Sequence, residues 1–225
     1  MFASCISAGI YTTNNPEACF YISNHSKAEI VVVEGNKQLE KYTQMKEKLS
    51  HLKALVVYGE KVDKKLADKC PVPVHSFEDF LLLGKDVPDA DIDARLFGLK
   101  PGNCSTLIYT SGTTGPPKAV MISHDNITWT SKAMADSYIA LNHTDRFLSY
   151  LPLSHIAAQF IDIHVPMYLG AATYFAQTDA LKGSLTHSMK DMKPTIFFGV
   201  PRVWEKIQEK MVQVELLFLP LVWLF

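Results

Sequence analysis

The stretch from Tyr109 to Lys118 reads YTSGTTGPPK and concentrates residue types that can bind a phosphate group. Gly112 and Gly115 allow positive φ angles, so successive backbone N–H groups can point at one anion. Lys118 adds a full positive charge, and the two prolines before it stiffen the approach. Thr110, Ser111, Thr113 and Thr114 supply hydroxyl donors. The stretch predicts a phosphate-binding loop; a Gly/Thr turn with a solvated lysine is the alternative that composition leaves open.

Other phosphate and catalytic signatures are missing from the sequence. The P-loop pattern G-x-x-x-x-G-K-[ST] does not occur, and a β-prone run rather than a helical one follows Lys118. There is also no G-x-S-x-G nucleophile elbow and no H-E-x-x-H metal motif. These absences disfavour a P-loop kinase, a serine hydrolase of that type and a zinc protease.

Short apolar runs alternate with helical patterns along most of the chain. Ser105 to Tyr109 and Ala119 to Ser123 predict a strand on each side of the loop. Asn15 before Pro16 predicts a helix start with Asn15 as N-cap. This alternation predicts an α/β fold, a mostly parallel sheet with helices on both faces. The other strands or extended pieces are expected at 29–34, 54–58, 71–74, 146–150, 172–175 and 195–200, and the other helices at 38–49, 77–83, 125–140, 180–192, from near Ser154 and from Pro201, with a surface connection over 84–102.

Composition excludes several classes of protein. With 48% hydrophobic and 20% charged residues, the chain is close to an average soluble protein. A net charge of −1 carries no basic surplus, so no nucleic-acid partner is expected. Four scattered cysteines without a Cys-x-x-Cys pair argue against a zinc site or a disulfide framework. The first residues lack the pattern of a secretory signal, and a cytoplasmic location is expected.

The segment from Leu216 to Phe225 is an apolar run interrupted only by Pro220. A membrane-spanning helix needs about 20 apolar residues, so the run is too short to cross a bilayer. A buried element, a shallow contact with an internal membrane and an abnormal chain end remain open.

Four blocks of the sequence resemble the AMP-forming adenylate synthetases, which activate carboxylic acids with ATP. YTSGTTGPPK matches their phosphate-loop signature in register. FLSYLPLSHIA (Phe147 to Ala157) looks like the segment that places a histidine or aromatic residue at the acyl pocket. PTIFFGVPRVWEKI (Pro194 to Ile207) is similar to the long-chain acyl-CoA synthetases, and GIYTTNNPEA (Gly9 to Ala18) resembles the bubblegum-type members. The resemblance runs from about residue 6 to Lys210.

The resemblance implies a long-chain fatty acid–CoA ligase that works in two half-reactions. A fatty carboxylate attacks the α-phosphate of MgATP and gives acyl-AMP and pyrophosphate; the thiol of coenzyme A then displaces AMP and gives acyl-CoA. The implied co-substrates and cofactors are therefore ATP, Mg²⁺ and coenzyme A, and no residue is assigned to a metal. By match to the motif, the β- and γ-phosphates would be held by Thr110, Ser111, Gly112, Thr113, Thr114, Gly115 and Lys118, with Lys118 also a catalytic residue.

His155 is the second catalytic residue that the resemblance implies. Ser154 is expected to cap a helix, which places His155 in the first turn, where the helix dipole disfavours the imidazolium. A neutral ring could orient the substrate carboxylate and move between the half-reactions, as the family role implies. The alternative is a histidine with only a capping-region role. The remaining candidates (His124, His143 and His164) are expected to be surface or core histidines.

Small residues in the second and third blocks leave two interpretations open. They could line an acyl tunnel, or they could be ordinary core at helical and strand spacing. They are Ala157, Ala158 and Gly199, with Ile156, Phe160 and Val200 beside them. Arg202 and Trp204 are expected to belong to the start of a helix.

The resemblance also implies a division of the chain. Residues 1–210 would form part of the large AMP-binding domain, residues 211–225 a divergent apolar tail, and the small C-terminal domain with its adenylation lysine would be absent. The adenine segment with its Mg-directed glutamate and the ribose-holding aspartate block are expected to be missing as well. Two functions stay open: a ligase of which this chain is a part, and a non-catalytic truncated product that binds partners or nucleotide weakly.

Overall fold

The computed structural model of the chain describes residues 4–45, 49–110, 116–137 and 141–222. The chain divides into two compact units. The first comprises residues 1–131 and 151–159, and the second comprises residues 132–150 and 160–225. The predicted α/β class is confirmed, because strands and helices alternate through both units.

The first unit holds a parallel sheet of three strands, in the order β2 (Ile30–Glu34), β3 (Ala54–Tyr58) and β4 (Val74–Ser76). Side chains alternate along β2, where Val31 and Val33 are buried and their neighbours are exposed. The buried valines join a core cluster in which Leu39 and Leu55 have no exposed surface. This alternation is the expected consequence of a strand with one face on the core.

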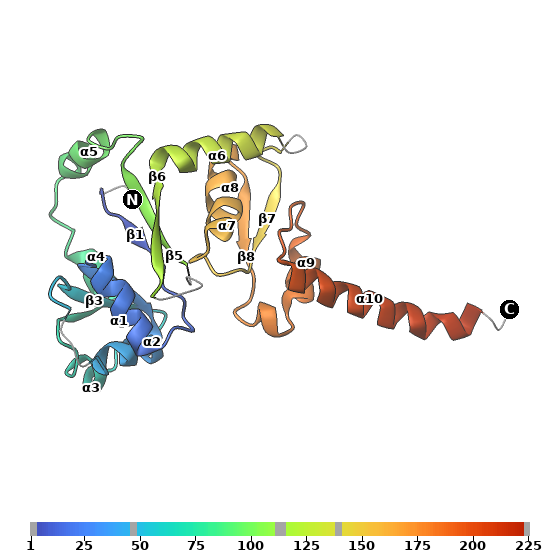
Figure 1. Ribbon diagram of the computed structural model, residues 1–225, viewed down its shortest axis with the longest axis horizontal. Coiled ribbons are helices and arrows are strands. Elements are labelled where there is room, and N and C mark those ends of the chain that lie inside the picture. Colours follow the sequence, from blue (N-terminus) through green and yellow to red (C-terminus); the bar gives the residue numbers. More distant parts are fainter. Residues whose placement is uncertain (1–3, 46–48, 111–115, 138–140, 223–225) are drawn as a thin grey trace. The chain divides into compact units, whose positions relative to one another are not determined.

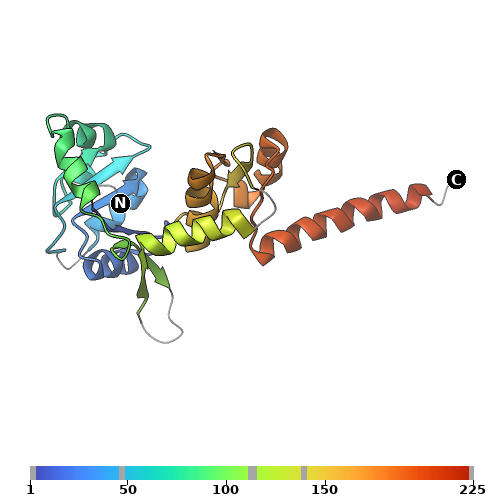
Figure 2. The ribbon, with the colours of Figure 1, turned by 90° about the horizontal axis from the view of Figure 1, so that it is seen from above.

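A second sheet of the first unit carries the predicted loop. Its strand order is β1 (Ser7–Ala8), β5 (Cys104–Thr110) and β6 (Lys118–Ser123). β1 and β5 are parallel, whereas β5 and β6 are antiparallel and form the hairpin drawn in green in Figure 2. Four of the five recorded strand pairs in the described residues are parallel, as predicted.

Five of the described helices precede β5 in the chain. The first begins as predicted, because the Asn15 side chain accepts a hydrogen bond from the N–H of Ala18 at 2.9 Å and Pro16 is the first helical residue. Figure 1 labels them all: α1 (Pro16–His25), α2 (Gly35–Thr43), α3 (Lys64–Ala67), α4 (Phe77–Leu82) and α5 (Asp89–Phe97). α5 lies inside 84–102, where only a surface connection was expected.

The second unit is built on a parallel pair of strands, β7 (Arg146–Ser149) and β8 (Ala172–Phe175). Phe147, in β7, is 1% exposed and is the largest fully buried side chain among the described residues. Of the remaining described elements, α6 (His124–Ser137) begins in the first unit and α7 (Ile156–Gln159) lies within it. The others belong to the second unit: the π-helix η1 (Phe160–His164), α8 (Val165–Leu169), the 3₁₀ turn η2 (Ala180–Lys182), α9 (Leu185–Met192) and α10 (Pro201–Val222).

The strand predicted at 195–200 does not form. Only an isolated parallel bridge joins Ile196 to Phe147. The N–H groups of Thr195 and Ile196 both donate to the carbonyl of Arg146, and the carbonyl of Phe198 accepts from the Tyr150 hydroxyl at 2.9 Å. Because these backbone groups already have hydrogen-bond partners, they are not free to pair with a neighbouring strand along the whole run.

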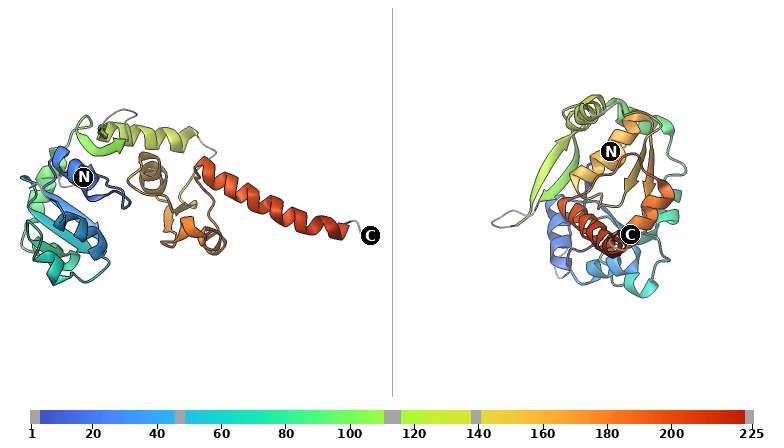
Figure 3. Two further views of the ribbon diagram at one scale, coloured as in Figure 1. Left: turned by 60° about the horizontal axis from the view of Figure 1, so that its bottom comes forward. Right: turned by 90° about the vertical axis from the view of Figure 1, so that its right-hand side faces the viewer.

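The last described helix, α10, continues from Pro201 to Val222, as both views of Figure 3 show in red. Among the described residues no helix combines the length and the apolar character needed to cross a membrane. The expected boundary at residue 210 falls within this helix.

Candidate functional site

The β5–β6 hairpin brings together the two described ends of the predicted phosphate loop. Thr110 is paired with Lys118 across the strands, and Tyr109 is paired with Ala119 one step before them. Thr110 and Lys118 are both exposed. The other predicted loop residues (Ser111, Gly112, Thr113, Thr114 and Gly115) lie outside the described residues.

The lysine at this hairpin end has no acidic partner within the described residues. Each recorded ion pair there joins other side chains, and none involves Lys118. Its positive charge therefore remains available for a mobile anion, which is what a phosphate site requires.

The base of β5 is anchored by polar contacts with β1. The Ser7 hydroxyl donates to the Thr106 hydroxyl at 2.9 Å, and the Thr106 hydroxyl lies 3.2 Å from the Ser7 carbonyl, within hydrogen-bond reach. Thr106 is fully buried. Because a buried hydroxyl needs a partner, these contacts fix the position of β5 relative to β1.

Helix α1 contacts both strands near the same hairpin end. The Tyr21 hydroxyl donates to the carbonyl of Pro117 at 2.9 Å. The Nδ1 atom of His25 lies 3.0 Å from the Tyr109 hydroxyl. Neither Tyr21 nor His25 was among the predicted site residues. Their spacing of four residues places them on the same face of a predicted helix, but it does not reveal which residues they contact.

His155 is positioned differently from the prediction. Helix α7 begins at Ile156, so His155 precedes the helix instead of lying in its first turn. Its own Nδ1 accepts a hydrogen bond from the N–H of Ala157 at 3.2 Å, which is the contact that an N-cap side chain makes. His155, not Ser154, therefore caps this helix.

This cap also defines the tautomer of the ring. A nitrogen that accepts a hydrogen bond carries no proton, so the tautomer compatible with this contact has its proton on Nε2. The His155 side chain is exposed. An exposed imidazole with its proton on Nε2 can donate a hydrogen bond to a carboxylate or carbonyl oxygen.

The segment before His155 packs tightly against the start of the chain. A Cβ atom placed on Gly9 would lie 2.9 Å from the Cα of Ser154 and 3.0 Å from its Cβ. Only a glycine allows this approach without a shift of one backbone. The block around Gly9 and the block around His155, which were noticed separately in the sequence, are thus in direct contact.

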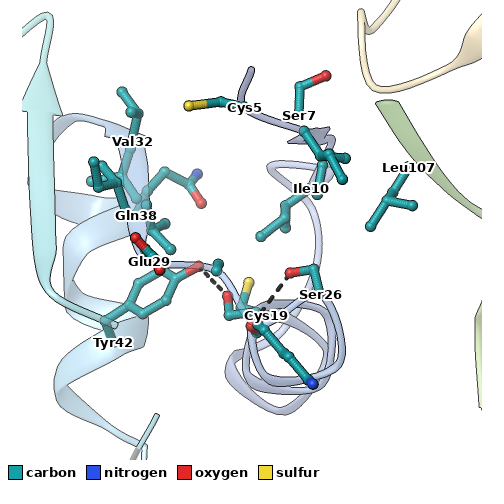
Figure 4. A pocket seen from close by; sticks show the side chains of 18 of the residues that line it. Cys5, Ser7, Ile10, Cys19, Ser26, Glu29, Val32, Gln38, Tyr42 and Leu107 are labelled. Atoms are coloured by element: carbon teal, nitrogen blue, oxygen red, sulfur yellow. Dashed lines mark hydrogen bonds between the residues drawn. The ribbon is translucent and has the colours of Figure 1, made fainter. Parts of the chain in front are cut away.

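A cavity of about 700 Å³ lies elsewhere in the first unit (Figure 4). Its lining comes mainly from residues 4–12, residues 26–29 and β2, with Leu107 of β5. Burial raises the pKa of the Cys19 thiol and raises the pKa of Tyr42 to about 12, so both groups are neutral at physiological pH. No lining residue was among the predicted site residues.

The remaining candidates divide between the two units. Ala158 is 1% exposed, and the indole of Trp204 donates to the Gly199 carbonyl at 2.9 Å near the start of α10. His164 is half-buried, and burial lowers its pKa, as expected for a core histidine.

Asp162, in the second unit, is 4% exposed and its pKa is raised to about 6 by burial, an effect that its hydrogen bond with Ser149 partly offsets.

No metal site is formed by the residues that the structure describes. Among these residues, no group of three or more His, Cys, Asp or Glu side chains is arranged so that it could hold an ion.

The model of the AMP-binding enzyme family matches residues 1–218. This match covers nearly the whole chain, including both blocks in contact at Gly9 and Ser154. The chain belongs to the AMP-binding enzyme family.

Similar members of the family include vertebrate proteins. The long-chain-fatty-acid–CoA ligase ACSBG2 of Xenopus laevis is 51% identical over 214 residues, which are 94% of this chain and 28% of the relative. ACSBG1 of Mus musculus is 46% identical over 217 residues, which are 95% of this chain and 29% of the relative. The chain thus spans less than a third of the length of these relatives.

The fold of this AMP-binding enzyme chain also occurs in solved structures. The anthranilate CoA ligase AuaEII, solved in complex with anthranoyl-AMP, superimposes with a TM-score of 0.67 and 23% identity. The match covers 86% of this chain and 35% of that protein. This similarity confirms the predicted α/β fold.

Proposed function

We propose that this chain is the phosphate-binding part of a long-chain-fatty-acid–CoA ligase. The observation that carries the proposal is the pairing of Thr110 with Lys118 at the open end of the hairpin. This pairing places a hydroxyl and an ammonium group at the two ends of the glycine-rich segment. The 51% identity with the Xenopus laevis ligase supports the fatty-acid substrate class.

The proposed reaction has two steps. A carboxylate oxygen of the fatty acid attacks the α-phosphorus of ATP, the bond to the bridging oxygen breaks, and pyrophosphate leaves. The sulfur of coenzyme A then attacks the acyl carbon, AMP leaves, and the thiol proton passes to solvent. The first step needs the leaving pyrophosphate to be held and its charge balanced, which is chiefly a matter of positioning and electrostatics.

Lys118 would supply the charge in this scheme. Its ammonium would contact the β- and γ-phosphates together with Thr110 and the predicted residues 111–115. His155 would donate its Nε2 proton in a hydrogen bond to the fatty carboxylate, since its Nδ1 is engaged with the Ala157 N–H.

Mg²⁺ is implied by the family, but the described residues offer no acidic cluster for it. We therefore derive no step through Mg²⁺ from this chain. ATP and coenzyme A are proposed as co-substrates. A cytoplasmic location, with the apolar end touching an internal membrane, is proposed and can be tested by cell fractionation.

The proposal is tested in a chimeric ligase, in which residues 1–210 of this chain replace the matching segment of the Xenopus laevis relative. Fatty-acid-dependent release of pyrophosphate from ATP is measured with palmitate and, as a matched control, with benzoate. We expect release with palmitate at least tenfold above benzoate. A folded chimera that releases no pyrophosphate with either acid would contradict the proposed function.

A further inference from the structure

Helix α1 holds a cluster of three rings against the phosphate hairpin. Tyr21 and His25 lie one turn apart on α1 and stack with ring centroids 5.5 Å apart and an angle of 21° between the planes. His25 also meets Tyr109 of β5 edge to face, with centroids 5.8 Å apart and an angle of 80°. His25 therefore lies between the tyrosine of the helix and the tyrosine of the strand.

The first contact of this cluster reaches β6 next to its lysine. The carbonyl of Pro117, which accepts from the Tyr21 hydroxyl at 2.9 Å, belongs to the same peptide group as the N–H of Lys118. Because a peptide group is planar, holding that oxygen also fixes the orientation of the Lys118 nitrogen. The Cα atom that carries the Lys118 side chain is bonded directly to this nitrogen.

The second contact reaches β5 next to its threonine. Tyr109, the neighbour of Thr110, is 7% exposed, and burial raises its pKa, so its hydroxyl stays protonated. That hydroxyl lies 3.0 Å from His25 Nδ1 and 3.5 Å from the Ile22 carbonyl. His25 and Ile22 belong to α1, and the side chain of Ser26, directly after the helix, also hydrogen-bonds to this hydroxyl.

The two contacts flank one strand pair. Tyr109 pairs with Ala119, and the next pair is Thr110 with Lys118, after which the described strands end. One helix thus holds both strands at the point from which the proposed phosphate ligands project. A contact with only a packing role would not require hydroxyl and imidazole groups at a surface where His25 is exposed.

We propose that Tyr21 and His25 are positioning residues that set the placement of Thr110 and Lys118 for phosphate binding. This inference rests on the proposed function. Neither side chain is proposed to touch the substrate; each acts through the backbone or side chain of a hairpin residue.

The test compares variants that change one contact at a time. Tyr21→Phe removes only the hydroxyl that holds Pro117. His25→Leu removes the nitrogen that meets Tyr109, whereas His25→Asn keeps a polar atom near the position of Nδ1. Tyr58→Phe, on β3 of the same unit, is the matched control for loss of a tyrosine hydroxyl.

Two readouts are measured for each variant. In the 225-residue chain, amide hydrogen exchange is followed for residues 118–123 and, as reference, for β2 and β3. In the chimeric ligase, kcat and the separate KM values for ATP and palmitate are obtained from pyrophosphate release. Loss of one hydrogen bond is expected to change a rate or binding constant by about two- to tenfold.

We expect Tyr21→Phe and His25→Leu to speed exchange at 118–123 and to lower kcat/KM for ATP by about two- to tenfold. KM for palmitate, exchange in β2 and β3 and the thermal midpoint should match Tyr58→Phe, and His25→Asn should stay near wild type. Faster exchange with unchanged ATP kinetics would overturn the positioning role, and so would equal effects of Tyr21→Phe and Tyr58→Phe. If the wild-type chimera releases no pyrophosphate, the proposed function fails; exchange that rises only at 118–123 would still show that the cluster holds the strand ends.

Discussion

Gly9 and Ser154 touch so closely that a Cβ atom on Gly9 would lie 2.9 Å from the Cα of Ser154. This contact seats the residue before His155 directly on the segment that follows β1. The position of the candidate histidine therefore depends on a glycine near the start of the chain. Two blocks that are far apart in the sequence are thus in direct contact in the structure.

Replacing this glycine should be costly. For Gly9→Ala we expect the free energy of unfolding to fall by about 1–3 kcal/mol, because one of two backbones must move. Urea denaturation measures the change. Gly102→Ala is the matched control, since a Cβ there meets nothing within 4 Å. Equal stability of the two variants would show that the contact is looser than the structure describes.

Loss of the hairpin lysine should slow adenylation. Lys118→Ala in the chimeric ligase removes a charge-assisted contact worth about 1.5–3 kcal/mol, so pyrophosphate release should slow by about 10- to 150-fold. Lys65→Ala, an exposed lysine on α3 of the same unit, should leave the rate unchanged. An unaltered rate in Lys118→Ala would remove this lysine from the phosphate site.

His155 requires a variant that separates its two roles. His155→Ala would lose the cap on Ala157 as well as the ring, and a lost cap costs about 0.5–2 kcal/mol. Asparagine caps helices well, so His155→Asn should retain stability while removing the Nε2 donor. We expect at least a tenfold slower single-turnover formation of the thioester in the chimeric ligase, with an unchanged circular dichroism spectrum. Normal thioester formation by His155→Asn would leave His155 with a capping role only.

Asp162 makes the stability of the second unit depend on pH. Burial raises its pKa from 3.8 to about 6, so between these values the folded state binds more protons than the unfolded state. Stability from this group is therefore highest below about pH 4 and falls as the pH rises towards 6, by about 3 kcal/mol. Asp162→Asn should be more stable than wild type at pH 7 and similar to it at pH 4, as measured by denaturation midpoints. A difference that does not change with pH would show that the carboxyl group is not the source.

The 225-residue chain alone should not complete the reaction. Its hairpin provides one lysine and hydroxyl donors, but positioning of the whole nucleotide supplies much of the catalysis. The chain spans less than a third of the length of its relatives, so residues 1–225 assayed alone correspond to only part of such a ligase. The purified chain is assayed with palmitate, MgATP and coenzyme A. Sustained formation of palmitoyl-CoA would contradict this prediction.

Local patterns in the sequence predicted the elements on either side of the site. Asn15 and Pro16 predicted the start of α1, and the β-prone runs before and after YTSGTTGPPK predicted β5 and β6. These features depend on the chemistry of neighbouring residues, namely capping groups and strand propensity, so they can be predicted without knowledge of the fold. The family of the chain could be predicted for the same reason, because its signature is one continuous segment.

Tertiary structure decided which of these elements meet. Neither the hydrogen bond from Tyr21 to Pro117 nor the contact of Gly9 with Ser154 has a local signal, because each joins segments far apart in the chain. The run at 195–200 has strand composition, yet it makes a single bridge because its backbone groups bond to Arg146 and Tyr150 instead of to a full ladder. Periodicity in a sequence specifies which face of an element is buried; which partner buries it, and which backbone groups remain to be paired, depends on packing between distant segments.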